Sequence, residues 1–67
     1  MSTNAVKQAI ANYLAAVEKK YGADVRVNTS VEHREGTDLV IKQGKKAPQL
    51  IDLGTLYNLT NMLKAGA

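Results

Sequence analysis

The chain opens on a pattern of apolar residues that repeats every three or four positions. Over residues 6–21 the large apolar side chains are Val6, Ile10, Tyr13, Leu14, Val17 and Tyr21. At 100° per residue these side chains share one face of a helix and polar residues occupy the other, so one face is expected to be buried. Three candidate N-caps precede the pattern, at Ser2, Thr3 and Asn4. Gly22 can adopt the left-handed conformation that ends such a helix.

Residues 25–32 alternate between two kinds of side chain. Val25, Val27, Thr29 and Val31 stand at every second position, which predicts a strand with one buried face. A turn centred on residues 35–37 leads into a second strand over residues 39–42. This loop length places His33 opposite Leu39 on the core side of a hairpin. A two-residue loop would turn Val40 inward instead, and burying Leu39 and Ile41 is preferred to burying Val40 alone.

Residues 49–53 predict a third strand that feeds a second helix. Pro48 cannot donate a backbone hydrogen bond to a sheet ladder, which suits the start of an edge strand. Gly54 then breaks the strand, and Thr55 is expected to cap a helix that ends at Gly66. The alternative is one helix over residues 49–64 with Pro48 in its first turn. An interior glycine would cost that helix about 1 kcal/mol relative to alanine, so the strand is preferred.

These elements predict one small α+β domain over residues 1–67, in two layers with the order α-β-β-β-α. The strands form a three-stranded antiparallel meander and both helices cover one face of it; an α-β-β-α arrangement is the alternative if residues 49–53 are helical. The predicted core consists of Val6, Ile10, Tyr13, Leu14, Val17, Val25, Val27, Val31, Leu39, Ile41, Ile51, Leu53, Leu56, Leu59 and Leu63.

Composition adds three expectations to this picture. A 67-residue chain without cysteine has a thin core and no disulfide to support it, so self-association as a homodimer is expected to contribute to stability. The chain carries nine Lys and Arg residues against six Asp and Glu, for a net charge of +3, which makes it a basic protein that would attract acidic partners. Its N-terminal segment has no secretory signal, and no membrane span is predicted, so a cytoplasmic location is expected.

Few residues in the chain could perform catalysis. There is no thiol, His33 is the single imidazole, and neither serine lies in a G-x-S-x-G context. The acidic side chains near the predicted hairpin turn do not suggest a metal site, because Glu32 and His33 should point to opposite faces of their strand. The chain is therefore expected to be no enzyme and to use no cofactor or metal. No motif in it identifies a family.

Two functions remain as hypotheses. The first is a small non-enzymatic protein-binding module, such as an accessory or inhibitor protein of a phage or other mobile element, because a small domain without catalytic groups acts by occupying a surface. Tyr57 lies outside the apolar arc of its helix, and Val40 and Leu50 lie on the uncovered sheet face, so these three are the expected partner-binding residues. The alternative is a nucleic-acid-binding protein that uses the basic residues along the hairpin, namely Arg26, Arg34, Lys42, Lys45 and Lys46.

Overall fold

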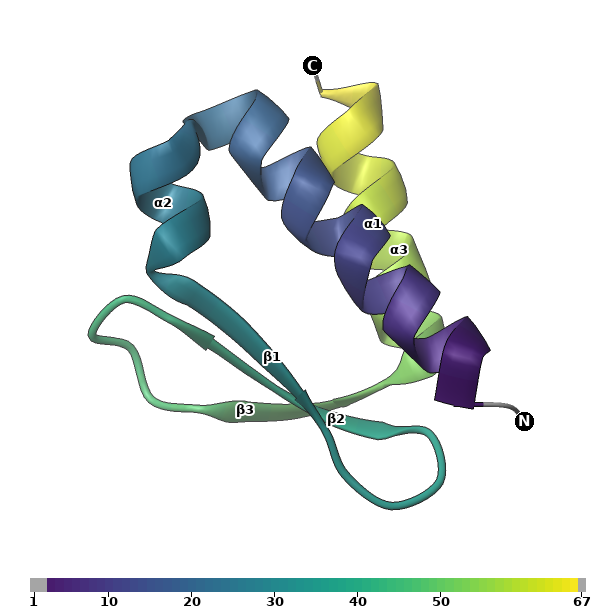
Figure 1. The fold of residues 1–67 in the computed structure, drawn as a ribbon. Coiled ribbons are helices and arrows are strands. Elements are labelled where there is room, and N and C mark those ends of the chain that lie inside the picture. The colour runs from purple at the N-terminus through teal and green to yellow at the C-terminus, as the bar shows by residue number, and fades with distance from the viewer. Residues whose placement is uncertain (1–2, 67) are drawn as a thin grey trace.

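The computed structural model of the chain describes residues 3–66. Along the chain the elements are α1 (Thr3–Tyr21), α2 (Ala23–Val27), β1 (Thr29–His33), β2 (Asp38–Gln43), β3 (Gln49–Asp52) and α3 (Leu53–Ala65). The strands form one antiparallel sheet in the order β1-β2-β3. The helices α1 and α3 pack against each other on one face of this sheet (Figure 1). The predicted two-layer α+β meander is therefore confirmed, and the single helix over residues 49–64 is excluded.

The hairpin between β1 and β2 has the predicted register. Val31 pairs with Ile41 and His33 with Leu39. The loop of residues 34–37 is closed by a backbone hydrogen bond of 2.8 Å from the Arg34 N–H to the Asp38 carbonyl, and the Asp38 N–H donates to the Glu35 carbonyl at 3.0 Å within the turn. Leu39 and Ile41 consequently face the helices and are buried, while Val40 points to the other side of the sheet. Burial of the two aliphatic side chains on the central strand is what selects this register.

The helix α3 begins three residues earlier than predicted, since its N-cap is residue 52 in place of residue 55. Its N-cap is Asp52, whose Oδ1 accepts a hydrogen bond of 2.7 Å from the backbone N–H of Thr55. The prediction of Thr55 as the cap is wrong because a carboxylate at Asp52 reaches the open N–H groups of the first turn and also suits the positive end of the helix dipole. Leu53 thus moves from the end of the strand to the first position of α3, where its side chain is buried.

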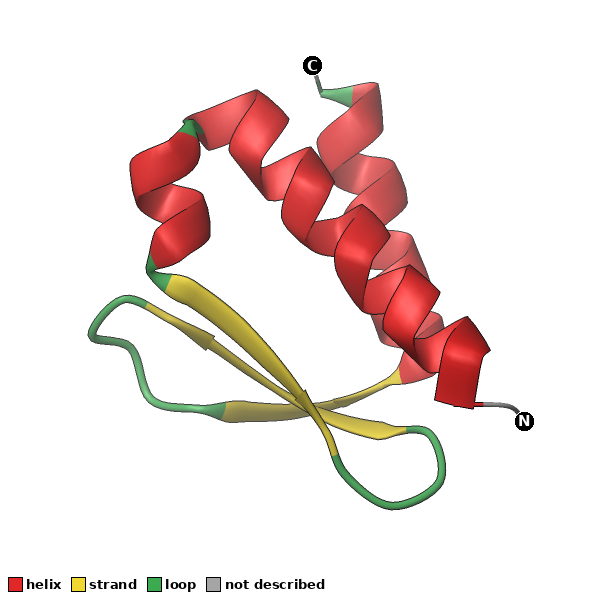
Figure 2. Cartoon of the chain, viewed as in Figure 1, coloured by secondary structure: helices red, strands yellow, loops and turns green. Residues whose placement is uncertain are grey.

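Residues 23–27 form the short helix α2 and not the first half of a strand, as Figure 2 shows. The predicted burial of Val25 and Val27 is therefore wrong, since these side chains are 39% and 76% exposed. Arg26 and Asn28, expected on a strand, lie on α2 and directly after it. The sheet begins only at Thr29.

Local hydrogen bonds explain why α2 forms. The side-chain amide of Asn28 donates to the Asp24 carbonyl at 2.9 Å, and the Thr29 hydroxyl donates to the Val25 carbonyl at 2.8 Å. The Asp24 carbonyl also accepts the backbone N–H of Asn28 at 3.3 Å, so the side-chain bonds add to a single backbone turn and stabilise the end of this short helix. Gly22 separates α2 from α1 with φ of 101° and ψ of 169°, a conformation that only glycine adopts readily and that differs from the left-handed helical one predicted for it.

The core lies between the two long helices and the inner face of the sheet. The predicted core residues Val6, Tyr13, Val17, Leu39, Ile41, Leu53 and Leu56 are buried. Six further predicted residues are partly buried and pack against this cluster, namely Ile10, Leu14, Val31, Ile51, Leu59 and Leu63. Thr60 is buried although it is polar, because its hydroxyl donates to the Leu56 carbonyl at 2.9 Å.

The structure also places the start of α1 and the single histidine. Thr3 and Asn4 lie within α1 and are not its caps, and the candidate cap Ser2 lies outside the described residues. His33 sits on the inner side of β1 but is exposed, and its Nε2 lies 2.7 Å from the Gly36 carbonyl in the hairpin loop. This contact ties the imidazole to the loop and not to the core.

Candidate functional site

The structure leaves one face of the sheet without a covering helix. We call this the outer face; it is formed by Ser30, Glu32, Asp38, Val40, Lys42, Leu50 and Asp52. The strand pairing sets Val40 between Glu32 on β1 and Leu50 on β3. Leu50 is 70% exposed and Val40 is partly exposed. The outer face therefore has an apolar centre with charged residues of both signs around it.

Two of the three predicted partner-binding residues adjoin on this face. Val40 and Leu50 line a shallow hollow together with Arg34, Glu35 and Asp38 from the hairpin loop and the start of β2. The third residue, Tyr57, is 47% exposed as expected from its helical position. It belongs to α3, which covers the opposite side of the sheet (Figure 1). The predicted set therefore belongs to two separate surfaces.

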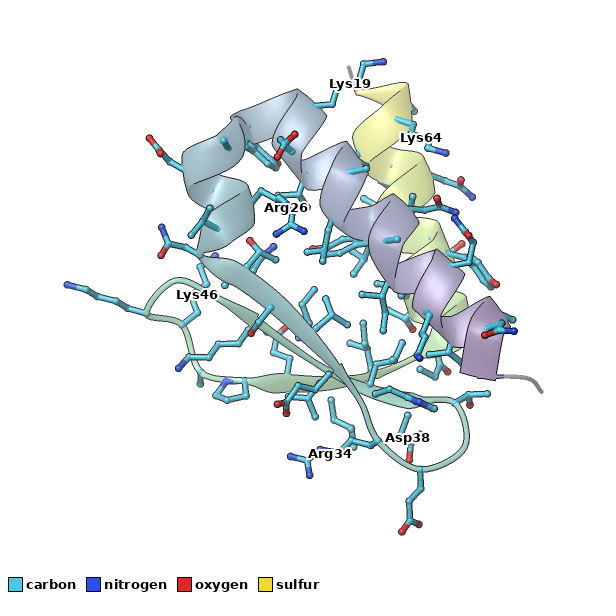
Figure 3. All side chains as sticks on the ribbon, in the orientation of Figure 1. Lys19, Arg26, Arg34, Asp38, Lys46 and Lys64 are labelled. Carbon is cyan, nitrogen blue, oxygen red and sulfur yellow. The ribbon has the colours of Figure 1, made fainter. Side chains whose placement is uncertain are left out.

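Four of the five basic residues proposed for nucleic-acid binding lie toward one end of the sheet. Arg26 is partly buried on α2, which leads into β1, and Lys42 is exposed near the end of β2. Lys45 and Lys46 follow in the loop between β2 and β3, where the Gly44 N–H donates to the Asn28 carbonyl at 2.8 Å. Arg34 lies in the loop between β1 and β2, and Figure 3 shows Arg34 and Lys46 at different ends of the sheet. The fold therefore gathers four of the predicted cations toward one end and leaves Arg34 apart from them.

A second concave surface was not predicted from the sequence. It is a groove of about 370 Å³ bordered by the second halves of α1 and α3 and by the loop between β2 and β3. Its apolar lining is mainly aliphatic, with two tyrosine rings beside the aliphatic side chains: Tyr13, Val17, Tyr21, Ile41, Ala47, Leu59, Met62 and Leu63. Two lysines, Lys20 on α1 and Lys46 on the loop, also line it, and no Asp or Glu within residues 3–66 does. We call this the lysine groove.

A polar pair lies in the wall of the lysine groove. The side-chain amide Nε2 of Gln43 donates a hydrogen bond of 3.0 Å to the hydroxyl oxygen of Tyr13. Burial raises the pKa of the Tyr13 phenol above its ordinary value; the bond from Gln43 opposes this and the neighbouring Tyr21 adds to it. The phenol therefore stays protonated at neutral pH. The periodicity of the sequence could not reveal this pair, because the two residues are 30 positions apart and belong to different elements.

Other kinds of site find no support in the part of the chain that the structure describes. No three His, Asp or Glu side chains within residues 3–66 lie close enough together to hold a metal ion. None of the described helices is both long and apolar enough to cross a membrane. Comparisons of the chain with protein-family models, with curated proteins and with solved structures found no match.

Proposed function

We propose that this chain is a small non-enzymatic protein-binding module whose outer face docks a protein partner. The observation that carries the proposal is the uncovered sheet face, where Leu50 is 70% exposed beside the partly exposed Val40. On the inner face of the same sheet, Leu39 and Ile41 are buried beneath the helices. The outer pair is the apolar part of the sheet that still lacks a covering element.

The chemistry of the outer face indicates what kind of partner it fits. Burying a leucine side chain completely stabilises a complex by about 1.5–3 kcal/mol. Because Leu50 is mostly exposed in the free domain, most of this free energy is still to be gained when a partner covers it. Lys42 lies at one end of the face, while Asp38 and Asp52 pair at the other. A partner surface with an apolar centre and the opposite charges at its two ends would match this arrangement, because complementary charge fixes orientation and register.

The remaining parts of the proposal rest on the sequence. We propose from the sequence that the protein is cytoplasmic and that it acts as an accessory or inhibitor protein of a phage or other mobile element. A second copy of the chain is one proposed partner. Nucleic-acid binding has less support, because Arg34 lies at the opposite end of the sheet from the other four candidate residues, and these four are divided among α2, the outer face and one loop. A gel-shift titration with duplex and single-stranded DNA and RNA tests it directly, and nucleic-acid binding would show a steep dependence on salt.

Replacement of Leu50 tests the outer face. The tagged chain is used to capture a partner from a lysate, and the affinity for that purified partner is then measured by isothermal titration calorimetry. Leu50→Asp is expected to weaken binding at least tenfold, which corresponds to about 1.4 kcal/mol. Val27→Asp is the matched control, because Val27 is another exposed aliphatic residue that lies off the outer face. Circular dichroism checks that both variants keep the fold.

Two further measurements decide between the surfaces. If Tyr57→Ala weakens binding while Leu50→Asp does not, the partner docks on α3 and the outer-face proposal is wrong. Sedimentation equilibrium of the isolated protein at high concentration tests the homodimer, since Leu50→Asp should then shift the equilibrium toward monomer and Val27→Asp should not. Equal affinity of the parent and Leu50→Asp for the captured partner would also contradict the proposal.

A further inference from the structure

The lysine groove has the size and lining of a small-molecule site. Its volume of about 370 Å³ falls within the range of roughly 300–1,000 Å³ that is typical of ligand pockets. The aliphatic side chains come from α1, β2 and α3, so the lining is built by the tertiary fold. Met62 lies at this groove yet is 68% exposed. A flexible methionine at a concave surface can adjust to an apolar ligand.

The charged side chains of the lysine groove determine whether it favours an anionic or a cationic ligand. Both ionised side chains that line it, Lys20 and Lys46, are cationic. Lys20 stands in the last turn of α1, where it also offsets the negative end of the helix dipole and lies 5.8 Å from the centre of the Tyr21 ring. Lys46 lies on the loop between β2 and β3, so its charge does not offset a helix dipole. Two ammonium groups, with no lining carboxylate among residues 3–66, favour an anion, and the apolar wall lowers the local dielectric and strengthens that preference.

The polar pair in the wall can supply a hydrogen bond to the same anion. Because the amide of Gln43 donates to the oxygen of Tyr13, the phenol keeps its own hydrogen for another acceptor. The raised pKa of this phenol keeps that hydrogen in place at neutral pH. A carboxylate accepts hydrogen bonds from phenols and from ammonium groups alike, and such charge-assisted bonds are stronger than neutral ones.

We propose that the lysine groove binds a small carboxylate that carries an aliphatic chain. The carboxylate lies between Lys20 and Lys46, and the chain packs along Leu59, Met62 and Leu63, whose side chains are at least partly exposed. Straight aliphatic chains suit this lining better than flat aromatic groups, because its apolar side chains are mostly aliphatic. The site is independent of the proposed protein-binding function, since α1, α3 and the inner side of β2 line the groove. Figure 1 shows both of these helices on one side of the sheet, and the outer face is the other side.

Titration of the isotope-labelled protein with decanoate, below its micelle concentration, tests the site by nuclear magnetic resonance. Decanoate should shift the amide signals of residues around the lysine groove in a saturable way. Decyltrimethylammonium carries the same chain with the opposite charge and should bind at least tenfold more weakly. Adenosine monophosphate is the third ligand. The inference is overturned if the cationic amphiphile binds equally well, if the nucleotide binds more tightly than decanoate, or if the shifts lie on the outer face.

Two pairs of variants separate charge from packing. Lys46→Gln should weaken decanoate binding about threefold to tenfold, whereas the matched control Lys42→Gln on the outer face should leave it unchanged. Met62→Glu and Met62→Lys both remove the exposed thioether but add opposite charges at the groove. Only Met62→Glu should abolish binding, and because Met62 is 68% exposed, both variants are expected to fold. Equal loss in the two Met62 variants, or in the two lysine variants, would show that charge does not select the ligand.

Discussion

Leu39 and Leu50 occupy neighbouring strands of one sheet but face opposite sides of it. Leu39 on β2 is fully buried at 0% exposure, and Leu50 on β3 is 70% exposed. Truncating each residue to alanine removes the same atoms from the same kind of backbone. The difference between the two variants therefore mainly measures what burial beneath α1 and α3 contributes, because strand preference, which differs between the central β2 and the edge strand β3, spans only about 1 kcal/mol.

The structure sets the expected magnitudes. Leu39→Ala removes a side chain from the packed core and leaves a cavity, which typically costs about 2–5 kcal/mol. Leu50→Ala removes a side chain that already contacts water, and surface substitutions of this kind usually change stability by less than about 0.5 kcal/mol. A domain of 67 residues is expected to have a total stability of roughly 3–10 kcal/mol. Leu39→Ala should therefore consume much or all of it.

Urea unfolding followed by circular dichroism provides the assay. The parent and Leu50→Ala should have nearly the same midpoint, and Leu39→Ala should have a much lower midpoint or be unfolded before urea is added. Each protein is measured at two concentrations, which separates folding from association. A cost for Leu50→Ala equal to that of Leu39→Ala, and independent of concentration, would refute the assignment of the two faces.

Two further predictions concern backbone conformation and pH. Gly22→Ala should destabilise the protein by about 1–3 kcal/mol, because Gly22 has φ of 101°. Gly54→Ala should instead stabilise α3 by about 0.5–1 kcal/mol, since the nearest side-chain atom to an added Cβ is 3.6 Å away. Thermal unfolding of both variants tests the two predictions. The hydrogen bond from the Thr55 N–H lowers the pKa of Asp52, so its contribution is present above the unfolded pKa of about 4 and is lost as pH falls through the lower folded pKa. Asp52→Asn keeps the cap without the charge and should lose less stability than the parent between about pH 5 and pH 2 in urea titrations; an identical pH dependence would contradict this.

The long helix and the hairpin could be predicted from the sequence because each depends on one periodicity. The spacing of three and four residues from Val6 to Val17 specifies the buried face of α1 whatever packs against it. In the hairpin, burial of Leu39 and Ile41 together favours one of two loop lengths and so predicts the register. The structure has the same register. Because side chains alternate strictly between the two faces of a strand, Leu39 and Ile41 either both face the core or both face away from it.

Apolar periodicity predicts the wrong element where a strand-like pattern and helix-forming side chains coincide. Val25 and Val27 alternate with polar residues and so predict a strand, yet the five-residue α2 occupies their place. The deciding signals are side-chain hydrogen bonds from Asn28 and Thr29 to carbonyls four residues earlier. Apolar periodicity over so short a segment does not detect them. The error at Thr55 has a similar cause, because the geometry of Asp52 and not residue preference decides which side chain caps α3.

The candidate sites divide along the same line. That Val40 and Leu50 share the outer face follows from strand alternation and antiparallel pairing, which the sequence determines by itself. Tyr57 lies apart from them because of how α3 packs on the sheet. The packing of α1 and α3 also decides that Lys20 and Lys46 line the same groove. Contacts between residues far apart in the chain are set by the collective burial of the core, and no local pattern encodes them. Only the tertiary structure therefore places the lysine groove.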